Sequence, residues 1–544
     1  MKKILSGLLI NLILAVIATI VIFIPDILYY VISEHYKGML NKTAITVVLA
    51  SYFLALSGRS MKPVIIISGL YSVIIASQII HHIYFGVWIA PTDVSLLFSE
   101  IDEILLSLTT IWKEIIITVL VVLAMFVAVM RLGGKFKHRT QYIPLMQLIL
   151  IWIYLGIIPP KAYKDPSVQN YYPSPQKTSL ENGINSLSWV VGKQLGGWLL
   201  GDESNSAIPE YDQLQITKKN KPEEMNIILV MGESLNPNHM QAFGYHRETT
   251  PFLNEYVKNN EIKIKKIYSG GLSTKVSIPT FFNLKRYPQD ISVFKNKEAS
   301  LPFMAATQGF ETWWLSTQTA GLATYVTGIK RENFVSKDDH WDEVLKFHDE
   351  YLLELIKKVD FSRSNFIVLH ERGSHSPYDK FHPKEFDKFS DNSDGVDSLK
   401  SHRINSYDNS ILYSDYVHKK IIDHVNKKSQ LPSVVIFTAD HGELQGENGW
   451  WGHSQLYPEV ARIPLVVWSK GIANEDIEQL MDLRFPTHFE LGVNIAKLLG
   501  YEVVDPNEKE GVYYANGKSI DGSAPFLQLE FAKNGELNDW DVSH

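Results

Sequence analysis

Long apolar runs are concentrated in the first third of the chain. They cover residues 4–24, 43–56, 64–80, 115–130 and 143–158. A helix that crosses a bilayer needs roughly 20 apolar residues, so the run at 43–56 is the shortest candidate. A cleaved signal peptide would have a shorter apolar core and a small-residue cleavage site, which the segment after Ile24 lacks. The pattern therefore predicts about five membrane-spanning helices, the first of them retained.

Basic residues mark one side of the predicted membrane domain. They precede the first apolar run and occupy every second loop, at Lys2, Lys3, Arg59, Lys62, Arg131, Lys135, Lys137 and Arg139. Short loops rich in Lys and Arg stay in the cytoplasm. We therefore predict a multi-pass membrane protein, which in a Gram-negative cell would belong to the inner membrane. Its N-terminus is cytoplasmic, and everything after residue 158 lies in the periplasm.

Two amphipathic segments are predicted to lie on the membrane surface. The first is in the loop at 81–113, and its apolar positions on one helical face are Val94, Leu97, Phe98 and Ile101. The second is in a Pro-rich and polar linker over residues 159–224. Its apolar positions are Leu187, Val190, Val191, Leu195 and Leu199. This linker would set the height of the following domain above the lipid.

From residue 225 onward, short apolar runs alternate with amphipathic stretches. Predicted strands are 226–230, 311–315, 365–369, 433–437 and 465–468, and predicted helices are 250–258, 342–358, 406–427 and 487–499. This alternation predicts a soluble α/β domain with a mainly parallel sheet flanked by helices on both faces. The tail at 513–544 is expected to form short strands and turns at the sheet edge. The predicted domains are thus 1–158, 159–224 and 225–544.

Charge and cysteine content exclude two classes of protein. The 544 residues carry a formal net charge of -7 and show no clustered basic face, so nucleic acid is not an expected partner. The chain has no cysteine, which excludes a disulfide framework. The periplasmic domain must therefore be stable without disulfides.

Two predicted strands end in residues that commonly bind metal. The run at 434–437 is followed by Asp440 and His441, and the strand at 226–230 is followed by Glu233. Ligands of open α/β sheets bind at the carboxyl ends of the strands. Glu, Asp and His together are typical zinc ligands. The alternative is that Asp440-His-Gly442 is only a turn after a strand.

A hydroxyl nucleophile is predicted at Thr274, with Ser234 as the rival. Thr274 follows a glycine pair at 270–271 and stands at an expected helix start, where an incoming phosphate is favoured. A free hydroxyl is a poor nucleophile near neutral pH and needs activation, for which a bound metal is one route. The alternative is that Ser273 or Thr274 merely caps the helix.

Six separated motifs occur in the order seen in a known family. They are Met231-Gly-Glu-Ser234, Phe243-Gly-Tyr-His-Arg-Glu-Thr-Thr-Pro251, Ser273-Thr-Lys-Val-Ser-Ile-Pro279, His375-Ser-Pro377, Tyr407-Asp-Asn409 and Asp440-His-Gly-Glu443. With these motifs the chain resembles bacterial phosphoethanolamine transferases. Those are membrane-anchored members of the alkaline phosphatase and sulfatase superfamily. The resemblance implies an alkaline phosphatase/sulfatase-like fold for the soluble domain.

The resemblance also implies roles for individual residues. The first Zn²⁺ would be held by Glu233, Thr274, Asp440 and His441, and the pattern leaves room for a second ion. His375 and His453 match family positions that contact the phosphoryl group or that second zinc.

Three further residues are weaker candidates. His370, at a strand end, is more often a hydrogen-bonded core residue in such a place. Glu443 and Glu447 follow the metal motif closely and would support its ligands, or would be exposed loop acids.

The chain departs from the family at three places. It lacks the cysteines of the lipid A-modifying members, the lysine that the family carries after Trp314, and clear matches to the donor-lipid contacts in the loop at 81–113. Substrate recognition is therefore expected to differ in these regions.

The implied function is transfer of phosphoethanolamine through a phospho-threonine intermediate. The donor would be the membrane phospholipid phosphatidylethanolamine. The acceptor would be lipopolysaccharide, at lipid A or the core, or another envelope glycan. The protein is expected to be a membrane-embedded monomer.

Other functions remain open. A phosphoglycerol transferase would use phosphatidylglycerol with the same site. A non-catalytic membrane sensor would retain the fold without turnover. A hydrolytic sulfatase is disfavoured because its formylglycine precursor signature is absent.

Overall fold

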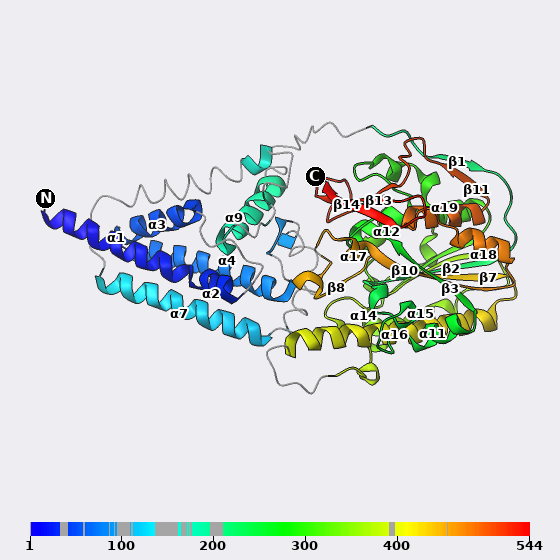
Figure 1. The fold of residues 1–544 in the computed structure, drawn as a ribbon, viewed down its shortest axis with the longest axis horizontal. Helices are drawn as coiled ribbons and strands as arrows, with labels where there is room; N and C mark the ends of the chain where they lie inside the picture. Colours follow the sequence, from blue (N-terminus) through cyan, green and yellow to red (C-terminus); the bar gives the residue numbers. More distant parts are fainter. Residues whose placement is uncertain are drawn as a thin grey trace. The chain divides into compact units, whose positions relative to one another are not determined.

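The computed structural model divides into two compact units, Met1–Ser206 and Ala207–His544 (Figure 1). The residues that it describes are 2–32, 42–57, 60–85, 88–91, 93–94, 109, 112–136, 161–164, 171, 173, 177–195, 210–390, 398–453 and 455–543. A separate linker over 159–224 stays a prediction, as do the domain boundaries drawn from the sequence.

The first unit is helical. Within the described residues its helices are α1 (Lys2–Ile22), α2 (Ile24–Ile32), α3 (Lys42–Ser57), α4 (Lys62–Phe85), α7 (Trp112–Phe136) and α9 (Ser179–Val190), which continues into the π-helical turn η2 (Val191–Leu195). Helices α1, α3, α4 and α7 cover the first four predicted spans. The fifth, at 143–158, and most of the loop at 81–113 lie outside the described residues.

By length and composition, one described helix segment, Lys62–Ile83, is apolar enough to cross a membrane. Three shorter apolar helices are Ser6–Ile22, Ala44–Ser57 and Ile115–Arg131. Large apolar side chains also lie on exposed faces, as Ile66 and Val73 of α4 do, with 67% and 68% exposure. A helix that is apolar all round is expected in the core of a large protein or in a lipid bilayer, and the exposed apolar faces of α4 favour the bilayer.

Helix α9 packs within the first unit. Its first residue, Ser179, donates from its backbone N and its hydroxyl to the two carboxylate oxygens of Asp26, at 2.7 and 2.8 Å. A Cβ on Gly183 would lie 2.3 Å from Ile74, so α9 and α4 approach closely there. Of the predicted amphipathic positions, Leu187 and Val191 are exposed, at 41% and 45%.

The second unit contains a seven-stranded sheet in the order β3-β10-β7-β2-β6-β4-β5. The strands are β2 (Asn226–Gly232), β3 (Ile262–Tyr268), β4 (Glu311–Ser316), β5 (Phe334–Val335), β6 (Asn365–His370), β7 (Ser433–Ala439) and β10 (Arg462–Lys470). All five predicted strands are present. The sheet is mostly parallel but mixed, because β10 runs antiparallel to both β3 and β7.

Sequence patterning explains which strands are central. Every residue of β2, β6 and β7 is buried, as expected for strands covered on both faces. Strand β3 was not predicted, since its Ile-Lys-Ile-Lys-Lys pattern lacks a continuous apolar run and fits an edge strand that is partly exposed.

Helices cover both faces of this sheet (Figure 1). They include α11 (Pro251–Lys258), α12 (Thr274–Phe282), α13 (Leu301–Thr307), α14 (Trp341–Phe347), α15 (Tyr351–Ile356), α16 (Ser398–Lys428), α17 (Pro458–Ala461), α18 (Asn474–Met481) and α19 (His488–Leu498). The predicted helix at 342–358 is broken into α14 and α15. The break is at His348, whose φ of 49° is left-handed.

Three smaller sheets complete the unit. Strand β1 (Gln215–Lys218) pairs with β11 (Tyr501–Val504), and β8 (Leu444–Gln445) pairs with β9 (Trp451–Gly452). The tail forms its own antiparallel sheet of β12 (Val512–Asn516), β13 (Phe526–Phe531) and β14 (Leu537–Ser543). A bridge between Gly271 and Asn516 joins this sheet to the loop before α12.

Candidate metal and nucleophile site

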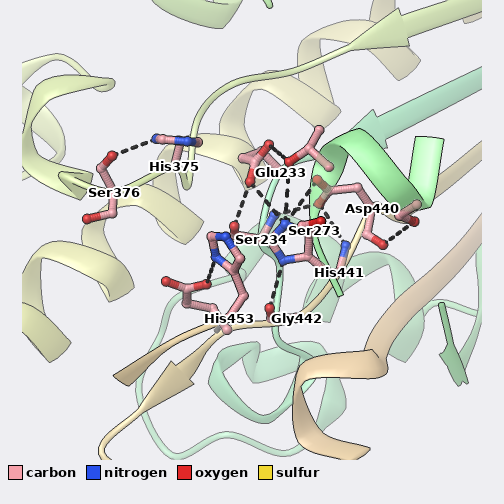
Figure 2. Close-up of polar contacts among 12 residues, drawn as sticks. Glu233, Ser234, Ser273, His375, Ser376, Asp440, His441, Gly442 and His453 are labelled. Atoms are coloured by element: carbon pink, nitrogen blue, oxygen red, sulfur yellow. Dashed lines mark hydrogen bonds and ion pairs between the residues drawn. The ribbon is translucent and has the colours of Figure 1, made fainter. Parts of the chain in front are cut away.

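The candidate site lies where β2 and β7 end. These neighbouring parallel strands pair Gly232 with Ala439, so Glu233 and Asp440 leave the sheet side by side. Asp440 and His441 are fully buried, and Glu233 is 1% exposed. Figure 2 shows the side chains of Glu233, Asp440 and His441 gathered in one cluster.

Four predicted residues meet within hydrogen-bond or ion-pair distance. His441 Nε2 lies 3.6 Å from Glu233 Oε1 and 3.3 Å from Asp440 Oδ2. The Thr274 hydroxyl donates to Glu233 Oε2 at 3.1 Å and lies 3.4 Å from His441 Nε2. The structure thus brings together residues that are up to 208 positions apart in the sequence.

The cluster fits a metal ion. The ligand atoms of Glu233, Asp440 and His441 all lie within 4.8 Å of one another. Asp440 Oδ2 is buried and accepts no hydrogen bond from the residues that the structure describes. His441 Nδ1 faces the Gly442 carbonyl at 2.9 Å, so a proton on Nδ1 leaves the Nε2 lone pair directed at the cluster. Such a backbone contact is the usual way to orient a metal-binding histidine.

The charges of the cluster also favour a cation. Burial raises the pKa of Asp440, and the neighbouring charge of Glu233 raises it further. Burial also raises the pKa of Glu233, but the charges of His375 and His441 and the hydrogen bonds from Ser234 and Gln318 outweigh it and leave that pKa below its usual value. Two buried carboxylates side by side repel each other unless a proton or a cation lies between them.

The loop before α12 places Thr274 at the first position of that helix. A Cβ on Gly271 would lie 2.7 Å from the Ser277 backbone N, so only glycine fits there. The Ser277 hydroxyl donates to the Asp440 carbonyl at 2.5 Å and ties α12 to the end of β7. Ser273, the residue before the helix, makes no side-chain capping bond, which disfavours the capping alternative.

Ser234 occupies a different environment. It is 1% exposed, its hydroxyl donates to Glu233 Oε1 at 2.6 Å, and its φ is 56°. Its backbone N donates to Asp440 Oδ1 at 2.9 Å. These contacts make Ser234 a support of the two carboxylates and leave Thr274 as the more accessible hydroxyl.

Two other sequence motifs support the turn after Glu233. The Tyr407 hydroxyl donates to the Ser234 carbonyl at 2.6 Å and accepts from the Asn236 backbone N at 2.8 Å. The next residue, Asp408, binds side chains of the segment after this turn. Its partners are His239 Nδ1 at 2.8 Å, the Tyr245 hydroxyl at 3.0 Å and Arg247 Nη1 at 2.8 Å. The buried Tyr407 therefore holds the left-handed backbone at Ser234, and Asp408 holds the segment that follows it.

His453 lies next to the cluster and His375 follows β6. The rings of His441 and His453 are 4.3 Å apart, and His453 Nδ1 lies 2.9 Å from Glu443 Oε2. His441, Glu443 and His453 form a second group with metal-binding geometry. His375 Nδ1 lies 2.6 Å from the Ser376 carbonyl, and its charge contributes to the low pKa of Glu233.

The weaker candidates have local partners. His370 is fully buried, its Nδ1 lies 3.1 Å from the Ser316 hydroxyl, and burial lowers its pKa to about 4. It therefore stays neutral within the core. Glu443 accepts from the Tyr378 hydroxyl at 2.6 Å in addition to its contact with His453. Glu447 accepts from the Gln445 backbone N within the β8–β9 hairpin.

Gln318 is a site residue that sequence reasoning missed. Its Nε2 donates to Glu233 Oε2 at 2.7 Å and to the Glu371 carbonyl at 2.9 Å. The residue follows the predicted strand at 311–315, so its place at a strand end was the available signal. No residue type in that segment indicates a metal site.

Comparison with known proteins gives three findings. The sequence pattern of the sulfatase family matches residues 225–501. The Kdo(2)-lipid A phosphoethanolamine 7''-transferase of Escherichia coli K12 is 28% identical over 351 residues, which are 60% of this chain and 61% of the relative. The phosphoethanolamine transferase EptA of Helicobacter pylori is 28% identical over 264 residues, 46% of this chain and 48% of the relative. The chain thus spans about half to three fifths of the length of these relatives.

A solved structure has the same fold. It is the integral membrane protein lipooligosaccharide phosphoethanolamine transferase A (EptA) of Neisseria meningitidis. The match has a TM-score of 0.56 at 19% identity and covers 90% of this chain and 95% of the other. The likeness therefore extends over both units of the chain.

Proposed function

Since the chain belongs to the sulfatase family, we propose that it is a membrane-anchored phosphoethanolamine transferase. The donor is phosphatidylethanolamine, and the acceptor is lipopolysaccharide, at lipid A or core, or another envelope glycan. One observation carries the proposal: the Thr274 hydroxyl stands against a buried Glu233, Asp440 and His441 cluster at a helix start. The names of the two relatives, which are phosphoethanolamine transferases, support the transferred group.

The residues that would hold zinc are Glu233, Thr274, Asp440 and His441. When bound there, zinc supplies a Lewis acid that lowers the pKa of a hydroxyl and offsets negative charge on a phosphoryl oxygen. A second ion would take Glu443 and His453 as donors, because the one free nitrogen of His441 is directed at the first ion.

The chain's own residues account for the transfer. Thr274 Oγ attacks phosphorus, and the bond to the diacylglycerol oxygen breaks, which leaves a phosphodiester on Thr274. The threonine proton is directed at Glu233 Oε2, and diacylglycerol leaves with one proton. An acceptor oxygen then displaces Thr274 Oγ, which regains a proton. The N-terminus of α12, where Thr274 stands, favours an anion such as the phosphate.

The first unit explains how donor and enzyme meet. We propose that it anchors the chain in the inner membrane with the N-terminus in the cytoplasm and the second unit in the periplasm. Enzyme and lipid confined to one surface have a raised effective concentration.

This topology predicts the outcome of reporter fusions. A periplasm-dependent reporter joined after Asn220 is expected to be active. The same reporter joined at Lys135 is expected to be inactive, because Lys135 belongs to the basic cluster that begins at the end of α7. Enzyme assays on cells that carry each fusion measure this. The reverse pattern would place the site in the cytoplasm and exclude the proposed donor route.

Mass spectrometry of envelope lipids and glycans tests the activity. Cells that express the chain are expected to contain glycolipid heavier by one phosphoethanolamine group than the same cells with an empty vector. Growth with labelled ethanolamine should label that species. An added phosphoglycerol group instead would assign the function to the phosphatidylglycerol-dependent alternative, and unchanged lipids and glycans would contradict a transferase.

A further inference from the structure

Gln318 lies in the short segment that follows β4, and it contacts the candidate metal ligand Glu233 directly. Its side chain is 5% exposed. The amide nitrogen has two N–H donors, and both have acceptors: Glu233 Oε2 at 2.7 Å and the Glu371 carbonyl at 2.9 Å. With both donors engaged, the amide has one orientation.

The backbone around Gln318 is fixed as well. The Gln318 N donates to the Ser316 hydroxyl at 2.9 Å, and its carbonyl accepts from the Lys337 N at 3.0 Å. The Glu371 N donates to the Met231 carbonyl at 2.9 Å. Gln318 therefore connects the ends of β4, β6 and β2 just where β2 delivers Glu233.

The two oxygens of Glu233 have different surroundings. Oε1 accepts from the Ser234 hydroxyl and lies 3.6 Å from His441 Nε2. Oε2 accepts from both Thr274 and Gln318. Loss of the Gln318 bond would leave Oε2 with Thr274 as its one donor among the described residues, so this oxygen would be held less firmly than Oε1.

We propose that Gln318 is a positioning residue for metal binding, which holds the Glu233 carboxylate in the orientation that the ion requires. The inference rests on the proposed function. A neutral amide suits this role because it donates a hydrogen bond without cancelling the negative charge that attracts the cation. Partners of this kind orient metal ligands and typically change metal affinity by roughly 10- to 100-fold when removed.

The test compares two Gln318 variants with a matched buried glutamine. Gln308 is 7% exposed, and its Nε2 donates to two carbonyls, those of Asn220 and Leu499, outside the site. Gln318→Leu removes the donor, and Gln318→Met removes it while keeping an unbranched side chain of similar length. Gln308→Leu is the control. Zinc affinity of the full chain in detergent is measured by competition with a chromophoric chelator.

We expect zinc affinity to fall by about 10- to 100-fold in both Gln318 variants and to stay at the wild-type value in Gln308→Leu. Thermal unfolding of the zinc-free proteins distinguishes metal positioning from support of the fold. Gln318→Leu and Gln308→Leu each lose two hydrogen bonds and should be destabilised alike, so a difference in zinc affinity between them reports on the metal site. In turnover assays, kcat should fall while the KM for the donor lipid stays unchanged.

Two outcomes overturn the inference in different ways. If the wild-type protein binds zinc and the Gln318 variants bind it with equal affinity, Gln318 only supports the fold. The proposed function would then stand. Wild-type protein that binds no zinc would remove the metal site itself, and with it both proposals. If Gln318→Leu fails to fold, the comparison is decided by Gln318→Met, whose unbranched side chain is close in size to the native one.

Discussion

Replacement of Thr274 by alanine is expected to abolish turnover while bound zinc is retained. The variant removes the oxygen that we propose forms the covalent intermediate, whereas the other three proposed zinc ligands, Glu233, Asp440 and His441, remain. Loss of a covalent nucleophile typically lowers kcat by about four orders of magnitude or more. The covalent adduct is measured by incubation with phosphatidylethanolamine labelled in its head group, without acceptor, followed by peptide mass spectrometry.

Three control variants make this result specific. Thr274→Ser keeps the hydroxyl and should retain part of the activity, although the methyl that restricts its rotamer is lost. Ser234→Ala should still form the adduct. Thr280→Ala removes a buried hydroxyl from the same helix, one without a hydrogen-bond partner in the described structure, and should leave turnover near wild type. Label on Ser234, or full turnover by Thr274→Ala, would refute the assignment.

Removal of Asp440 or His441 is expected to abolish both zinc binding and transfer. Asp440→Ala deletes a carboxylate whose Oδ2 has no hydrogen bond within the described chain, and His441→Ala deletes the imidazole that touches both carboxylates. Zinc affinity should fall by more than the roughly 10- to 100-fold typical of losing an outer hydrogen-bond partner. Elemental analysis after chelator treatment and dialysis measures this loss.

A buried aspartate outside the cluster controls for loss of stability. Asp349 is 2% exposed and accepts from the backbone N of Arg372 and of Gly373, at 2.9 and 2.6 Å. Asp349→Asn should keep its zinc even if the protein is destabilised. The metal proposal is wrong if Asp440→Ala or His441→Ala retains turnover after zinc has been removed.

Local patterns were sufficient to predict most strands of the sheet. Strands β2, β6 and β7 each contain an unbroken apolar run, at 227–231, 366–369 and 434–437, and all their residues are buried. A short run of sequence therefore already specifies a central strand. Strand β10 was also predicted, but its direction was not. Direction depends on which neighbours a strand pairs with, and β10 lies between β3 and β7, which are far apart in the chain.

In the candidate site, as in the sheet, some features could be predicted from local sequence and others could not. Glu233, Asp440 and His441 were predicted because they directly follow strands, and parallel neighbours deliver their ends to one edge. For Thr274, the glycines and the helix start are likewise local signals. The sequence alone therefore determined that three metal-type side chains follow strand ends and that a hydroxyl begins a helix.

Only the tertiary structure decided what holds these groups in place. Gln318 reaches Glu233 across 85 positions of sequence, and Tyr407 reaches the Ser234 carbonyl across 173. Glutamine and tyrosine carry no local mark of such a role, because a single hydrogen bond leaves no periodicity or composition signal. Their contribution depends on a few tenths of an ångström between elements brought together by the packed core, which is why no reading of the linear chain specifies it.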